Sequence, residues 1–158
     1  SQESRQVAAW LIFDVRQRQP MELPVCSFDD PKTVVAAFVR AMNAWELFAA
    51  RLPKEDGVTP WATVRQELDA VFERFCTQKE RPYGRQGSFQ SPPEYDPARE
   101  EIIGVTIESP KKAFVDTRRE AALGGGEYRY VLHQNAGRWL VDNLKFKESD
   151  GSYSKAIL

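Results

Sequence analysis

Apolar residues recur at intervals of three and four after Asp30 and Pro31, as they do along one face of an α-helix. The stripe consists of Val34, Val35, Phe38, Val39, Met42, Trp45, Phe48 and Leu52. Aspartate followed by proline is a common helix start, because the carboxylate caps free backbone N–H groups and proline fits the first turn. The pattern therefore predicts a helix over residues 31–52.

A second helical stripe begins after the pattern breaks at Pro53 and Gly57. Thr59 and Pro60 again provide a cap followed by proline. The apolar positions that follow with helical spacing are Trp61, Val64, Leu68, Val71, Phe72 and Phe75. The spacing predicts a second helix that starts near residue 61 and ends near Gln78.

The last third of the chain alternates apolar and polar residues, which is typical of an antiparallel sheet with one buried face. Turn sequences divide it, notably Ser109-Pro110-Lys111 and Asn135-Ala136-Gly137. Four strands are predicted, over residues 102–107, 113–119, 127–134 and 138–147. Two helices followed by four antiparallel strands predict an α+β fold, in which the helices pack on a curved sheet and leave a conical pocket.

The segment between the second helix and the sheet, residues 78–97, follows neither pattern. It contains prolines and glycines at short intervals, with aromatic residues scattered between them. Loops of this length are uncommon in compact domains and often carry function. We therefore expect this segment to contact a binding partner.

Length and charge restrict the classes of protein that fit the chain. Its 158 residues suffice for one domain with a substantial core and are too few for two ordinary domains. The 22 lysines and arginines nearly balance the 23 aspartates and glutamates, so the formal charge is −1. A chain without a strong net charge has no overall attraction to nucleic acid or to an anionic membrane, and neither is expected as a partner.

The cysteines and the longest apolar run bear on the compartment. Cys26 and Cys76 lie far apart in the sequence, which favours buried free thiols in a reducing compartment, with a single disulfide bond as the alternative. The longest apolar run, residues 7–13, is much shorter than the roughly 20 residues that cross a bilayer. We expect a soluble, cytoplasmic protein, although a chain whose signal peptide had been removed would look the same.

Four phrases in the predicted helix and strands resemble a known family. They are Phe38-Val39-Arg40-Ala41-Met42-Asn43-Ala44-Trp45-Glu46, Lys112-Ala113-Phe114-Val115-Asp116-Thr117, Tyr130-Val131-Leu132 and Gly137-Arg138-Trp139-Leu140-Val141-Asp142. Together they resemble the NTF2-fold immunity proteins of bacterial polymorphic toxin systems, over about residues 29–146. The resemblance implies an NTF2-like cone. It also implies a small cytoplasmic protein that binds a cognate toxin domain and neutralises it.

Residues 1–28 lie outside this resemblance, and we expect them to form an N-terminal extension packed on an NTF2-like domain of residues 29–158. Within the extension, the bulky apolar segment 10–15 predicts a short buried strand, with a helical turn as the alternative. Met42 and Trp45 in the first helix have the spacing of core residues. Asn43 and Glu46 beside them are polar, and they would either bond to neighbouring backbone or line the cone.

Some NTF2-like folds are isomerases or cyclases that use a carboxylate inside the cone, and this is the alternative function. The candidate groups are His133, Asp116 and Asp142. Strand alternation places His133 on the face of Arg129 and Val131, opposite the bulky face of Tyr128, Tyr130 and Leu132, so it should be exposed. Asp116 would pair with Arg118 or lie on a solvated edge. Asp142 would point inward, with no second catalytic group placed near it by the spacing, so no catalytic, cofactor-binding or metal-binding residue is assigned.

An immunity protein works by affinity, so its functional residues lie at an interface with the toxin domain. Interfaces favour aromatic residues and arginine at their centre and charged residues at their rim. The long segment supplies both kinds, and the partner-binding residues expected from it are Arg81, Tyr83, Arg85, Phe89, Glu94, Tyr95, Asp96, Glu100 and Glu101. The alternative is that the aromatic residues only pin the segment to its own domain. Self-association is a further expectation that one sequence leaves open.

Overall fold

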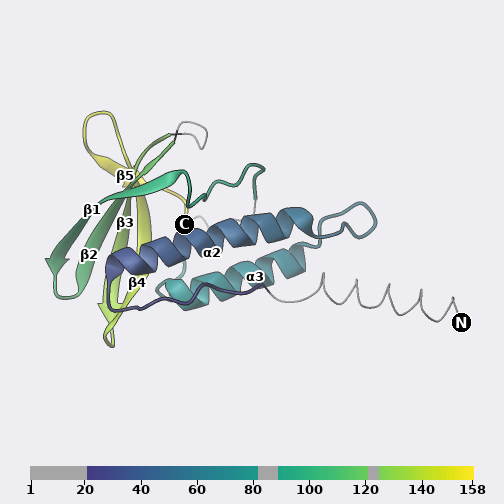
Figure 1. Cartoon of the computed structure of the whole chain (residues 1–158), viewed down its shortest axis with the longest axis horizontal. Coiled ribbons are helices and arrows are strands. Elements are labelled where there is room, and N and C mark those ends of the chain that lie inside the picture. The colour runs from purple at the N-terminus through teal and green to yellow at the C-terminus, as the bar shows by residue number, and fades with distance from the viewer. Residues whose placement is uncertain (1–20, 82–88, 121–124) are drawn as a thin grey trace, which may run out of the picture.

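Two helices and a five-stranded sheet form two layers in the computed structural model (Figure 1). The described residues are 21–81, 89–120 and 125–158. The elements are α2 (Pro31–Arg51), α3 (Trp61–Phe75), β1 (Glu100–Ser109), β2 (Lys112–Arg119), β3 (Gly126–Asn135), β4 (Arg138–Lys147) and β5 (Tyr153–Lys155). This is the expected α+β, NTF2-like arrangement of helices on a curved antiparallel sheet. The strand predicted over residues 10–15 lies outside the described residues.

Both helices begin where the sequence predicts, but the predicted cap by Thr59 is wrong, because Pro60 is the N-cap of α3 and no side chain caps its first turn. The Asp30 side chain accepts a hydrogen bond from the Lys32 backbone N–H at 3.4 Å, which caps the first turn of α2. The end of α3 differs from the prediction, because the helix stops at Phe75 and not near Gln78. Cys76 is extended and forms a bridge with Val141 of β4, so these residues leave the helix to bond the edge of the sheet. Interstrand hydrogen bonding therefore ends α3 early.

The strands follow one another across the sheet in the order β1-β2-β3-β4-β5, and every neighbouring pair is antiparallel. The four predicted strands are present. The fifth, β5, has three residues, too few to produce an alternating pattern. The register between β3 and β4 shifts between Val131 and Leu132, and both residues are buried. The expectation that Val131 shares the exposed face of His133 is therefore wrong, although His133 itself is exposed.

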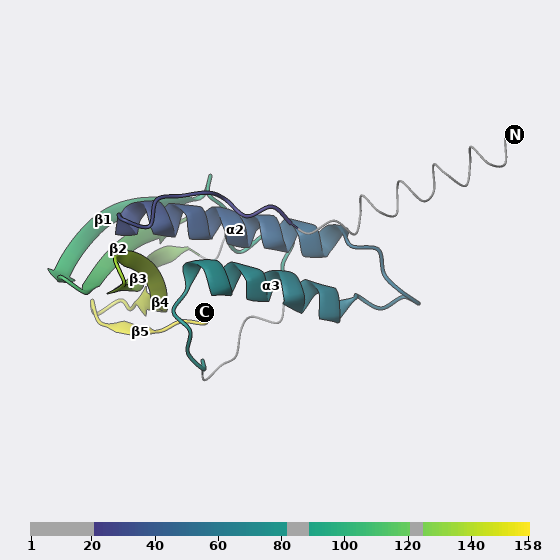
Figure 2. The ribbon, with the colours of Figure 1, turned by 90° about the horizontal axis from the view of Figure 1, so that it is seen from below.

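The core lies between the helices and the concave face of the sheet. Phe38 of α2 is at its centre, with its ring 5.9 to 6.4 Å from those of Phe72, Phe75, Tyr95 and Tyr130. Figure 2 shows the sheet curving around the N-terminal end of α2 and the C-terminal end of α3. By length and composition α2 could cross a membrane, but its apolar residues are the centre of this core, as in the core helix of a globular domain.

The described part of the N-terminal extension lies against this core. Met21, Leu23, Cys26 and Phe28 are partly buried and pack on it. The Trp139 backbone N–H donates to the Phe28 carbonyl at 2.9 Å, and the Arg138 guanidinium lies 4.2 Å from the centre of the Phe28 ring. No disulfide bond joins Cys26 and Cys76.

Candidate functional site

The inside of the cone is occupied by a buried ion pair between Arg119 and Glu100. Arg119 Nε donates to Glu100 Oε1 at 2.8 Å, and both side chains are 1% exposed. The other carboxylate oxygen, Oε2, accepts from the hydroxyls of Thr117 at 2.8 Å and Tyr130 at 2.7 Å. A buried carboxylate is stable when its lone pairs are bonded in this way, so the pair is a complete structural unit.

Aromatic rings enclose the arginine of this pair. The Arg119 guanidinium lies 4.7 Å from the centre of the Tyr95 ring and 4.1 Å from that of Tyr128. Burial alone would lower the pKa of Arg119, but Tyr130, Tyr95 and Glu100 together raise it above its usual range, so the side chain stays charged. Burial raises the pKa of Tyr95 and of Tyr130, so both keep their hydroxyl protons. The interior is filled by these groups.

Glu46 is a second buried carboxyl, and it holds the long segment in place. Its Oε2 accepts a hydrogen bond from the backbone N–H of Glu94, whereas its Oε1 is buried with no hydrogen-bond partner among the residues that the structure describes. One turn earlier on α2, Asn43 Nδ2 donates to the Tyr95 carbonyl at 2.8 Å. Of the two roles expected for Asn43 and Glu46, the structure shows bonding to neighbouring backbone. Burial, reinforced by Glu94, raises the pKa of Glu46 to about 7, although the Glu94 N–H opposes the shift.

The raised pKa of Glu46 predicts a pH dependence of stability. Between pH 4.5 and about 7 the folded protein holds this proton more tightly than the unfolded chain, so stability falls as the pH rises through that range. Glu46→Gln keeps a neutral acceptor for the Glu94 N–H and should be more stable than the wild type above pH 7 by about 1–3 kcal/mol. The advantage should vanish near pH 4.5. Urea unfolding at several pH values measures the difference.

The exposed Glu73→Gln on α3 is the control for this prediction, because Glu73 lies outside the core. Its unfolding free energy should follow that of the wild type at every pH. A Glu46→Gln curve parallel to the wild-type curve would show that Glu46 does not titrate in this range.

The residues considered for an enzyme are paired with other side chains. Asp116 accepts from Arg129 at 2.7 and 3.1 Å, and not from Arg118 as expected. Asp142 accepts from the Thr77 hydroxyl at 2.7 Å and from Lys79 Nζ at 3.1 Å, and the imidazole of His133 lies 3.7 Å away.

The environment of Asp142 corrects one expectation from the sequence, because a second titratable group, His133, does lie near it. Burial would raise the pKa of Asp142, but the hydrogen bonds from Thr77 and Lys79 and the charge of His133 lower it below its usual value. A proton-transfer acid inside a cone needs the opposite shift. Asp142 is therefore an ion-pair partner. Among the described residues no group of three side chains could hold a metal ion.

The partner-binding residues expected from the sequence are scattered by the fold. Tyr95 and Glu100 belong to the buried network, and their contact with a partner stays a prediction. Tyr83 and Arg85 lie outside the described residues. Phe89 packs on Trp61, with ring centres 5.7 Å apart, so this aromatic residue pins the segment to its own domain. Arg81 lies beyond the C-terminal end of α3, over the Phe72 ring.

Three acidic members of the set, Glu94, Asp96 and Glu101, remain near the surface. Glu94 is half-buried and lies 3.5 Å from Arg119, and Asp96 pairs with Arg99 at 3.7 Å. Glu101 is exposed at the start of β1. Asp96 and Glu101 therefore lie at the end of the long segment, where it joins β1.

The strand β1 carries half of the exposed large apolar side chains of the described residues. Of six such residues, Ile103, Val105 and Ile107 lie on β1. Val105 and Ile107 pair with Val115 and Ala113 of β2, which are fully buried, so they share the concave face. They are exposed because the β1–β2 hairpin extends past the N-terminal end of α2 (Figures 1 and 2). The alternation of residues along this strand indicates that Val105 and Ile107 are buried. They are exposed because α2 does not extend far enough to cover them.

Two hollows lie at the start of β1, and we call these hollows and the exposed apolar residues of β1 together the β1 surface. The smaller one, of 160 Å³, lies between α2 and β1 and includes Ala36, Val39, Arg40 and Ile102. The larger one, of 420 Å³, lies at the start of β1 and the end of β2. Charged side chains dominate its lining, which includes Arg99, Glu101, Arg118 and Glu120. The β1 surface thus has a charged end at the start of the strand and an apolar end at Val105 and Ile107.

Comparison with known proteins gives two similarities. The sequence profile of a family described as NTF2 fold immunity protein matches residues 30–156, a range that includes both helices and all five strands. The chain is also similar to "Immunity protein RhsIA" of Dickeya dadantii (strain 3937), with 34% identity over 112 residues, 69% of this chain and 81% of the relative. No solved structure matches the chain.

Proposed function

The chain belongs to the NTF2-fold immunity protein family, and on this basis we propose that it neutralises its cognate toxin domain by binding it through the β1 surface. Membership of this family indicates an immunity protein and not an enzyme, and the partner of an immunity protein is a toxin. The observation that supports the β1 surface is the pair of Val105 and Ile107, exposed on one face of an edge strand, with Ile103 also exposed on the same strand. Contiguous exposed apolar groups on a folded domain are typical of a protein interface.

The charged residues at the start of β1 also suit a protein interface. Specific interfaces have an apolar centre, where most of the binding energy arises, and a polar rim that speeds encounter and selects the partner. Here Asp96 and Glu101 lie beside the larger hollow together with Arg99 and Arg118. Two of the acidic residues expected to contact the partner, Asp96 and Glu101, therefore lie at the charged end of the β1 surface.

The free edge of β1 adds backbone groups to the surface. Among the described strands only β2 pairs with β1, so within that part of the chain its other edge has unpaired N–H and C=O groups that a strand of the toxin domain could join. The register shift between Ile102 and Gly104 and the exposed Glu101 and Glu108 are features that discourage indiscriminate edge pairing. The edge is thus suited to a selected partner.

The proposal predicts that the double variant Val105→Glu, Ile107→Glu loses about 100-fold in affinity for the toxin domain, because it places charge at an apolar interface centre. The matched control is Val58→Glu, in the turn after α2. Val58 is 59% exposed and Ile107 is 57% exposed, so both changes affect surface valine or isoleucine. Isothermal titration calorimetry with the purified toxin domain measures the affinities, and survival of cells that express the toxin domain measures protection.

The two variants separate the outcomes of this test. Loss of affinity in the double variant alone, with an unchanged melting temperature, supports the β1 surface. Equal toxin affinity of the wild type, the double variant and Val58→Glu would show that the interface is not the β1 surface. It would not contradict the immunity function. Light scattering of the free protein belongs to the same experiment, because a second copy of the chain could pair along the same edge.

We also propose that the protein acts in the cytoplasm. Cys26 forms no disulfide bond, which supports a reducing compartment. Burial raises the pKa of the Cys26 thiol, although Arg74, Arg40 and Arg138 oppose the shift, and this favours the unreactive protonated form.

A further inference from the structure

The smaller hollow of the β1 surface has the size and the walls of a pocket for one apolar side chain. Its volume is 160 Å³. An apolar cavity of about 150 Å³ is large enough for a benzene molecule, so this hollow has room for one aliphatic or aromatic side chain. Its walls are formed by Ala36 and Val39 of α2, Pro97 of the long segment and Ile102 of β1.

The polar groups that line this hollow are already bonded within the protein. Glu100 and Thr117 belong to the lining, and the Thr117 hydroxyl donates to Glu100 Oε2 at 2.8 Å. The other carboxylate oxygen of Glu100 accepts from Arg119 at 2.8 Å. Covering a bonded polar group breaks no hydrogen bond, whereas covering an unbonded one costs free energy. The lining therefore tolerates an apolar occupant.

The hollow lies where a strand added to the free edge of β1 would direct a side chain. Ile102 pairs with Thr117 of β2, which is fully buried, so Ile102 lies on the concave face. Among the described residues no strand pairs with the other edge of β1. A strand added there directs alternate side chains to the concave face. The side chain nearest Ile102 on that face then enters the space between β1 and α2.

A cation stands at the border of the hollow. Arg40 of α2 belongs to the lining, and its side chain is exposed. No carboxylate of the described residues pairs with it. Interfaces juxtapose charges of opposite sign, so an acidic residue of a partner complements this border.

We propose that the toxin domain contributes an extended segment that joins the free edge of β1, places one apolar side chain in the smaller hollow and pairs an acidic residue with Arg40. The inference rests on the proposed β1 interface and specifies the chemistry of the partner that this interface selects. Strand addition supplies backbone hydrogen bonds, and a side chain enclosed in a pocket supplies much of the binding energy of an interface. The hollow thus selects the segment by its anchor residue.

Ala36→Phe tests the hollow, because the new ring fills it from the helix. The variant should bind the purified toxin domain at least about 30-fold more weakly in isothermal titration calorimetry, since the anchor side chain loses its place. The control is Ala50→Phe, an exposed position near the end of the same helix, which should bind as the wild type does. Equal affinity of all three proteins, or equal losses in the two variants, would overturn the inference.

Arg40→Gln tests the charge at the border. Its affinity for the toxin domain should fall about tenfold at low ionic strength and less at high ionic strength, where salt screens the pair. Arg51→Gln, exposed in the last turn of α2, is the control and should bind as the wild type does. Equal affinities of the two arginine variants at low salt would contradict the acidic contact.

A third measurement uses the unaltered chain, so it does not depend on how a variant folds. In the complex, the methyl groups of Ala36, Val39 and Ile102 should show nuclear Overhauser effects to aliphatic or aromatic protons of the toxin domain. Their absence in a complex that forms would overturn the inference. A dimer of the free protein in light scattering, joined through these same methyl groups, would assign the hollow to a second copy of the chain and overturn it as well.

Failure of this inference is distinguishable from failure of the β1 proposal. If Val105→Glu, Ile107→Glu weakens toxin binding and Ala36→Phe does not, the β1 interface stands and the hollow is unused. If neither change weakens binding, the β1 proposal itself fails.

Discussion

Arg119→Met should lower the free energy of unfolding by about 3–5 kcal/mol, because it leaves the Glu100 carboxylate buried without its cation. The same change also removes the cation–π contacts that the Arg119 guanidinium makes with the Tyr95 and Tyr128 rings. Urea unfolding followed by circular dichroism measures the loss.

The neighbouring Arg118 provides a matched control. Its side chain is 57% exposed and pairs with Glu127 at 3.1 Å across the outside of the sheet. Exposed pairs contribute little, so Arg118→Met should cost at most about 1 kcal/mol. Adding Glu100→Leu to Arg119→Met should recover part of the loss, because the uncompensated carboxylate is then removed. Equal losses for the two arginine variants would contradict the buried pair.

Phe38→Ala should cost about 3–5 kcal/mol, the usual range for removing a buried phenylalanine side chain and leaving a cavity. Phe38 is fully buried, and its ring meets those of Phe72, Phe75, Tyr95 and Tyr130. It joins both helices, the long segment and the sheet, so little of the surrounding structure is free to collapse into the space. Thermal and urea unfolding measure the change.

The control for this second prediction is Phe48→Ala on the same helix. Phe48 is half-buried, so its loss removes less apolar contact and leaves a site that solvent can fill. We expect a cost below about 2 kcal/mol. A loss in Phe38→Ala no larger than in Phe48→Ala would show that the aromatic centre of the core is not packed as described.

The sequence predicts the elements well where local periodicity and turn chemistry decide them. The cap at Asp30, the stripe of α2 and the hairpin at Asn135-Ala136-Gly137 depend on neighbouring residues. The end of α3 and the burial of Val131 depend instead on β4, which follows much later in the chain. Interactions of this kind leave no periodic signal.

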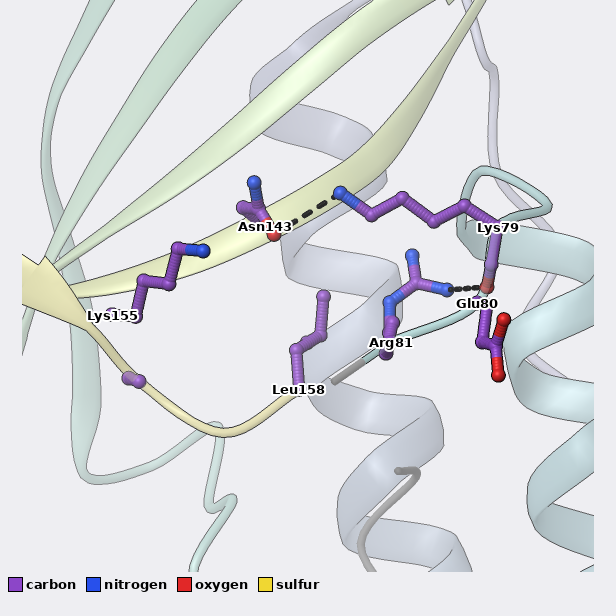
Figure 3. Close-up of a pocket in the computed structure, with 7 residues that line it drawn as sticks. Lys79, Glu80, Arg81, Asn143, Lys155 and Leu158 are labelled. Carbon is purple, nitrogen blue, oxygen red and sulfur yellow. Dashed lines mark hydrogen bonds between the residues drawn. The ribbon is translucent and has the colours of Figure 1, made fainter. Parts of the chain in front are cut away.

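The site was harder to predict than the fold. The prolines and aromatic residues of the long segment indicate contacts, but whether Tyr95 contacts a partner or Phe38 depends on the position of α2. The exposure of Ile107 has the same origin, because its alternation is that of a core strand. Residues 79–81 and Lys155 line one hollow (Figure 3). They are far apart in the sequence, so only the folded chain brings their charges together.

The filled interior of the cone has a consequence for how such a protein can change its partner. Arg119, Glu100 and Tyr130 secure the fold from within, whereas Val105 and Ile107 project beyond the helices and contribute little to the core. Substitutions at exposed positions of this kind seldom alter stability greatly. With the proposed β1 interface, partner specificity and foldability reside in separate sets of residues, and a lineage of such chains could follow a changing toxin without first having to restabilise its scaffold.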